Sequence, residues 1–133
     1  MIRLASAVVA ALLPALAWAQ VGPPVNPIQC NAAAQYSSSV AGTTQLVPLV
    51  TGKAIYICGY DISAAAGSTL QLVYGTGSNC GTGTTNVTPA FTPTNTNDSS
   101  PFFRGLLVPL SNALCLTQTG AVAVQALVFY GQY

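Results

Sequence analysis

The sequence predicts an all-β protein: a single-domain, jelly-roll-like antiparallel sandwich of about seven to nine short strands that contains disulfides. Beyond residue 19, no window keeps a helical period of apolar residues through three turns. Short runs of apolar and β-branched residues are instead separated by turn-forming clusters of Gly, Pro, Asn and Thr. Four cysteines in a chain of 133 residues add cross-links. Together these features favour a sandwich or small barrel, and among such folds we expect the jelly roll.

The N-terminal residues 1–19 have the pattern of a cleaved signal peptide. Arg3 precedes an apolar run, and small residues stand at Ala17 and Ala19, the two positions that a signal peptidase reads. We expect cleavage between Ala19 and Gln20, so that the protein is secreted, periplasmic or at the cell surface. An uncleaved anchor helix is the alternative, although the run is shorter than the roughly 20 residues that a membrane span needs. No later segment predicts a membrane span.

Residues 20–29 form a Pro-rich N-terminal extension before the sandwich domain at 30–133. Pro23, Pro24 and Pro27 exclude a helix or a central strand here. The extension is either a flexible tail or an arm that docks on a neighbouring molecule.

Short strands then follow one another along the domain. We expect them at residues 33–38, 45–50, 54–62, 69–74, 87–91, 102–110, 113–117 and 121–130. A Gly- and Thr-rich loop at 75–85 and a polar loop at 92–100 separate the middle strands. Pro48 predicts an edge or a bend for the second strand.

The segment 54–62 is the clearest strand of the first half. Strict alternation places Ile55 and Ile57 on one face. The same alternation puts on the opposite face Tyr56, Cys58, Tyr60 and Ile62. Both faces of this strand are therefore expected to be covered.

The cysteines Cys30, Cys58, Cys80 and Cys115 predict two disulfides, because an even number in an exported chain is typical of such cross-links. A metal site is the alternative, but no pair has C-x-x-C spacing and histidine is absent. The pairing stays open. Loop-closure entropy slightly favours Cys58 with Cys80, which leaves Cys30 with Cys115.

Charge is scarce along the whole chain. Only 4% of residues are charged, against about a quarter in ordinary domains. After signal cleavage the charged side chains are Lys53, Asp61, Asp98 and Arg104, which sum to zero. Nucleic-acid binding needs clustered Lys and Arg, so we expect no nucleic-acid partner. A nearly neutral surface also resists self-association poorly.

No constellation in the sequence predicts catalysis, and no catalytic, cofactor or metal site is expected. Histidine is absent, so no side chain titrates near neutral pH without a perturbed environment. Asp61 is expected inside a strand and Asp98 in the polar loop, with nothing to set them opposite each other. Lys53 lies in a turn without a neighbouring serine, and Arg104 is interpreted as a partner for one of the aspartates. The Gly loop lacks the spacing and the lysine of a phosphate-binding loop.

The motifs IYICGY at 55–60, YGTGSNCGTGTT at 74–85 and NALCL at 112–116 are followed by a long terminal strand. With this combination the chain, over roughly 30–133, resembles a group of small uncharacterised secreted or phage-associated jelly-roll-like β proteins of bacteria and their viruses. The resemblance implies a jelly-roll-like fold and a structural role in a virion or at a cell surface. It brings no catalytic residues.

The predicted function is that of an exported structural or adhesive interaction domain, which associates with copies of itself or with a surface protein. The alternative is a carbohydrate-binding module. It would use exposed members of the set Tyr36, Tyr56, Tyr60, Tyr74, Tyr130 and Tyr133 for sugar stacking. Enzymatic activity is not expected.

Overall fold

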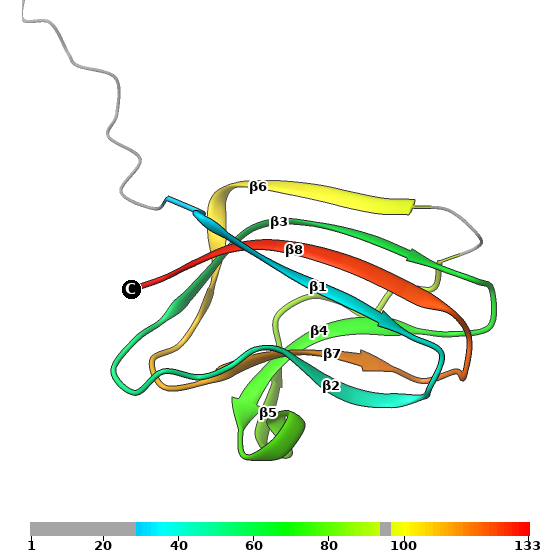
Figure 1. Ribbon diagram of the computed structural model, residues 1–133, viewed down its shortest axis with the longest axis horizontal. Coiled ribbons are helices and arrows are strands. Elements are labelled where there is room, and N and C mark those ends of the chain that lie inside the picture. Colours follow the sequence, from blue (N-terminus) through cyan, green and yellow to red (C-terminus); the bar gives the residue numbers. More distant parts are fainter. Residues whose placement is uncertain (1–28, 94–96) are drawn as a thin grey trace, which may run out of the picture.

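Eight strands form two facing antiparallel sheets in the computed structural model, which describes residues 29–93 and 97–133 (Figure 1). The predicted signal peptide and nearly all of the Pro-rich extension lie outside these residues. The strands are β1 (Ala32–Ser38), β2 (Gly42–Val47), β3 (Ile55–Ala64), β4 (Leu70–Thr76), β5 (Thr82–Asn86), β6 (Asn97–Val108), β7 (Ala113–Gln118) and β8 (Val124–Gln132). One short 3₁₀ turn, η1 (Ser78–Cys80), lies between β4 and β5.

The strand order is that of a jelly roll. One sheet has the order β1-β8-β3-β6 and the other the order β2-β7-β4-β5. The antiparallel pairs β1 with β8, β2 with β7, β3 with β6 and β4 with β5 are nested within one another, as in a single long hairpin that is rolled up. The predicted all-β, jelly-roll-like sandwich is confirmed.

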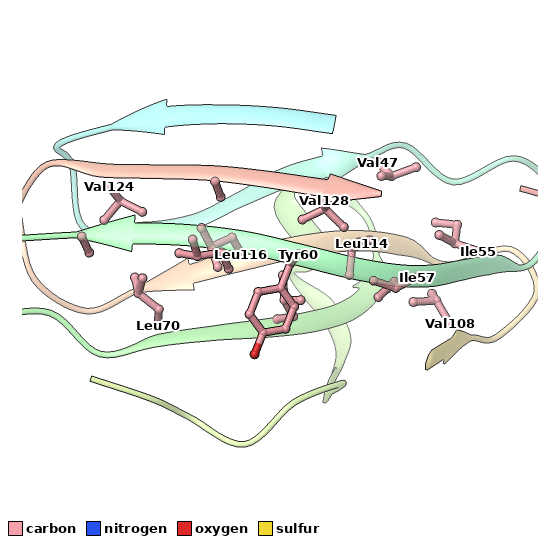
Figure 2. Packing of buried hydrophobic residues seen from close by; sticks show 14 residues of the cluster. Val47, Ile55, Ile57, Tyr60, Leu70, Val108, Leu114, Leu116, Val124 and Val128 are labelled. Carbon is pink, nitrogen blue, oxygen red and sulfur yellow. The ribbon is translucent and has the colours of Figure 1, made fainter. Parts of the chain in front are cut away.

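The two sheets enclose one apolar core. Alternation along each strand turns one set of side chains inward, and the largest fully buried members include Ile55, Ile57, Ile62, Leu70, Leu72, Leu114, Leu116, Val124 and Val128 (Figure 2). Each such side chain contributes about 1.5–3 kcal/mol relative to exposure. In the terminal strand β8, the alternating residues Val124, Ala126 and Val128 all belong to this core.

A β-bulge at Cys58 changes the faces of β3. Ile57 pairs with Tyr130 and Gly59 with Phe129, so Cys58 has no partner in β8. The extra residue shifts the alternation by one position. Ile55 and Ile57 before the bulge, and Tyr60, Ile62 and Ala64 after it, all belong to the core. The prediction that Tyr60 and Ile62 face away from Ile55 is therefore wrong.

The disulfides join Cys30 to Cys58 and Cys80 to Cys115, with Cα separations of 6.1 and 6.3 Å. The slight preference for Cys58 with Cys80 and Cys30 with Cys115 is wrong. Closure entropy distinguishes such loops by less than about 1 kcal/mol, so the topology decides the pairing. Cys58 lies in the β1-β8-β3-β6 sheet, whereas Cys80 follows β4 of the other sheet.

Two middle strands differ from the expectation. The predicted strand at 87–91 is reduced to a single bridge between Leu70 and Phe91, while β5 forms inside the Gly- and Thr-rich segment. β6 begins at Asn97, within the predicted polar loop. It is an edge strand, which tolerates both polar residues and Pro101.

Candidate functional site

The four charged residues of the described part of the chain come from one turn and two strands. Lys53 is exposed in the turn between β2 and β3, and Asp61 is exposed on β3. Asp98 lies in β6 rather than in a loop, where it pairs with Ile62 while Asp61 pairs with Ser99. The backbone therefore puts the two aspartates on neighbouring strands, one register position from being opposite. The expectation that Asp98 lies in a loop is wrong, whereas the two aspartates are not directly opposite each other, as expected. Arg104 also lies in β6.

The Lys53 turn has a serine beside it, contrary to the expectation. The Gly52 N–H donates a hydrogen bond to Ser111 Oγ at 2.9 Å, and the Ser111 N–H donates to the Lys53 carbonyl at 2.9 Å. Both contacts involve the backbone of the turn. The serine hydroxyl thus braces two loops against each other.

The six tyrosines do not form an exposed platform. Tyr60 is buried and stacks on Phe91, with ring centroids 6.0 Å apart and an interplanar angle of 9°. The Tyr36 hydroxyl donates to the side-chain oxygen of buried Gln118 at 3.3 Å. Half-buried rings that pack against the core or a neighbouring ring are Tyr36, Tyr56, Tyr74 and Tyr130. Of the six, only Tyr133 is exposed, and its ring lies against that of Tyr56.

The Gly- and Thr-rich segment covers part of the outer face of the β2-β7-β4-β5 sheet. Cys80 and Cys115 form a small buried cluster there with Val73 and Ala113. The Gln45 N–H donates to Asn79 Oδ1 at 3.1 Å, which ties η1 to β2. The conspicuous motif at 74–85 therefore has a structural role, that of a loop pinned over a sheet.

A shallow groove with a mixed polar and apolar lining lies on the outer face of the other sheet, over β1, β8 and β3. Pairing sets Gln35, Leu127 and Asp61 in one row across the three strands. Ser37, Gln125 and Ser63 form the next row. These six residues line a cavity of about 610 Å³ together with Tyr36 and Ala126. Within the described residues, no hydrogen bond or ion pair engages the Asp61 carboxylate.

One end of the sandwich exposes apolar side chains. Leu49 and Val50 lie between β2 and β3, Leu110 lies between β6 and β7, and Leu107 is near the end of β6. The two loops and the C-terminus lie at the same end of the molecule (Figure 1). Hydrogen bonds hold this end together, because Ala54 and Tyr133 exchange both backbone bonds, at 2.7 and 3.1 Å. We refer to Leu49, Val50, Leu107 and Leu110 as the apolar end.

Neither the groove nor the apolar end was predictable from the sequence. The groove depends on the register of three strands that are far apart in the chain. The apolar end depends on which loops the topology brings together. Neither leaves a local pattern in the sequence.

Among the described residues, no helix is long and apolar enough to cross a membrane. In the same part of the chain, no group of three or more His, Cys, Asp or Glu side chains is placed to hold a metal ion. Comparison of the chain with family models, with curated proteins and with solved structures found no match.

Proposed function

We propose that this chain is an exported structural or adhesive domain, at a cell surface or in a virion-like assembly, that works by association with further copies of itself. The observation that carries the proposal is the apolar end. Leu107 and Leu110 are 55% and 60% exposed, and Leu49 and Val50 add 37% and 41%. Covering leucine and valine side chains removes apolar area from water, which is favourable by about 25 cal/mol for each Å² before the entropy cost of association is subtracted.

The scarcity of charge supports this proposal. Lys53 is the only charged residue in the two loops of the apolar end. Two copies that approach through this end meet little repulsion and need to desolvate few ionic groups. Among the described residues, the exposed polar side chains outside the apolar end are mostly hydroxyls and amides, which do not keep molecules apart by net charge.

The two disulfides support an oxidising location, because such cross-links persist outside the reducing cytoplasm. The fold by itself does not select a function, since jelly rolls occur in capsid proteins, lectins and enzymes. A carbohydrate module that uses exposed tyrosines has less support, because five of the six rings are buried or half-buried.

Sedimentation velocity of the processed chain, residues 20–133, over a range of concentrations tests the proposal. We expect reversible association that is weakened by the double variant Leu49→Ser/Leu110→Ser. Val40→Ser is the matched control, because Val40 is 70% exposed in the β1–β2 turn at the opposite end (Figure 1). A chain that stays monomeric at every concentration, or a double variant that associates like the wild type, would overturn the proposal.

A further inference from the structure

We infer that the groove over β1, β8 and β3 is a binding site for a neutral carbohydrate. This inference is independent of the proposed self-association, because that association uses the apolar end and not the groove. It also differs from sugar stacking on exposed tyrosines, because the one tyrosine in the lining, Tyr36, is half-buried. The outward-facing side chains of the groove are five polar residues and one leucine.

The dimensions of the groove suit a sugar. Neighbouring strands lie about 4.8 Å apart and successive outward residues on one strand about 6.6 Å apart. The six lining side chains therefore form a field of roughly 10 by 7 Å, comparable to one or two pyranose rings. A second cavity of about 350 Å³ shares Ser63 and Gln125 with the first and extends the groove towards Ala65 and Ala123. A ligand longer than one ring can follow the strands in this direction.

The chemistry of the lining matches a polyol. The Asp61 carboxylate accepts hydrogen bonds from adjacent hydroxyls, and the amides of Gln35 and Gln125 both donate and accept. Ser37 and Ser63 add hydroxyls at the next row. Leu127 lies between Gln35 and Asp61 in the register and offers an apolar surface to the C–H face of a ring.

Other ligand classes fit this lining less well. The six residues include one carboxylate and no Lys or Arg, so phosphates and other anions are disfavoured. A single carboxylate supplies too few ligands for Ca²⁺. A cationic peptide is the competing ligand, and it would depend on the charge of Asp61.

The covalent frame holds the groove in shape. The central strand β8 is hydrogen-bonded on both sides, to β1 and to β3. The Cys30–Cys58 disulfide links the residue two positions before β1 to β3, so that it joins the two strands on either side of β8. A site whose backbone is fixed in advance loses little conformational entropy when a ligand binds.

The test begins with a glycan array of neutral oligosaccharides, probed with residues 20–133 of the chain. Binding of the strongest glycan is then measured by calorimetry for Asp61→Asn and Gln125→Leu. Gln45→Leu is the matched control, because Gln45 is likewise an exposed glutamine on a strand, but of the other sheet. Asp61 and Gln125 are exposed, so the folded state of each variant is verified by its thermal midpoint.

We expect binding of a neutral glycan that is insensitive to salt, a loss of about tenfold in affinity in each groove variant, and no change in Gln45→Leu. Absence of binding on the array and in NMR titration with methyl hexosides would overturn the inference. Binding that Asp61→Asn and Gln125→Leu leave unchanged would overturn it equally. In a parallel titration with an oligolysine peptide, binding that is released by salt and lost in Asp61→Asn, without binding of any neutral glycan, would identify a cationic ligand and overturn the inference as well.

Discussion

The Gly52 N–H donates a hydrogen bond to the hydroxyl of Ser111 at 2.9 Å, across 59 positions of sequence. Gly52 lies in the loop between β2 and β3, and Ser111 lies in the loop between β6 and β7. This contact holds together the two loops that expose Leu49, Val50 and Leu110. The arrangement of the two loops at the apolar end therefore depends on the hydrogen bond between Gly52 and Ser111.

Replacement of Ser111 by alanine should lower the free energy of unfolding by about 0.5–1.5 kcal/mol, because the Gly52 bond is lost. Ser111 has a φ of 59°, a left-handed conformation that costs an ordinary residue roughly 1 kcal/mol. Ser111→Gly loses the same bond but relieves this cost, so its stability should lie closer to that of the wild type. Urea unfolding of the three proteins measures the difference. Equal stability of Ser111→Ala and the wild type would show that this hydrogen bond contributes nothing.

The two disulfides should differ in their resistance to reductant. Cys80 and Cys115 are 1% and 0% exposed, whereas Cys30 and Cys58 are both half-buried. Thiol exchange requires access to a sulfur atom, so limiting reductant should open Cys30–Cys58 first. Alkylation followed by peptide mass spectrometry identifies the freed thiols. Earlier labelling of Cys80 and Cys115 would contradict the burial of that pair.

Removal of either disulfide by paired alanine substitution should cost about 2–5 kcal/mol. The loops that they close, with separations of 28 and 35 residues, are similar in length, so chain entropy alone predicts similar costs. Cys80→Ala/Cys115→Ala should cost more, because it also opens space in the buried cluster with Val73 and Ala113. Thermal unfolding of the two double variants compares them, and an equal or smaller loss for this pair would argue against the cluster.

Substitutions at Leu116 and Leu110 should have different effects, the first on the stability of the monomer and the second on association. Leu116 is fully buried between the sheets, and Leu116→Ala should cost about 2–5 kcal/mol in unfolding free energy. Leu110 is 60% exposed, so Leu110→Ala should leave the unfolding free energy of the monomer within about 0.5 kcal/mol of the wild type. Its effect should instead be on the concentration dependence of sedimentation. A large loss of monomer stability in Leu110→Ala would show that this residue supports the fold.

The Pro-rich extension offers a separate test of assembly. If it is an arm that docks on a neighbouring copy, deletion of residues 21–27 should abolish association and leave a folded monomer. The domain from Cys30 onward contains both disulfides and the whole core, so the deletion should not change the thermal midpoint of the monomer. Size-exclusion chromatography with light scattering reports both species. Normal assembly of the deletion variant would show that the extension is only a tail.

The fold class was predictable because it follows from periodicity and turn chemistry, which are local. The terminal strand shows this, since its alternating residues Val124, Ala126 and Val128 all belong to the core. The faces of β3 were not predictable, because nothing in the alternation of Ile57, Cys58 and Gly59 marks the bulge. One unpaired residue reverses every face that follows it.

The disulfide pairing, the groove and the apolar end could not be predicted without knowledge of the strand topology. Loop entropy could not decide between partners for Cys58, whereas the separation of the two sheets did. The polar start of β6 resembles a loop in sequence, and pairing with β3 makes it a strand. In the sequence, Asp61 stands out only as an isolated charge. The other groove residues Gln35 and Gln125 come from the first and the last strand of the chain, which the fold places beside each other.

Hydrogen exchange at low and high protein concentration tests most directly whether copies associate through the apolar end. Association through this end predicts that, on concentration, amide protection rises at residues 48–54 and 109–112 and stays constant at 39–41, in the β1–β2 turn. Protection that is independent of concentration in both loops, or that rises in the β1–β2 turn instead, would contradict association through the apolar end.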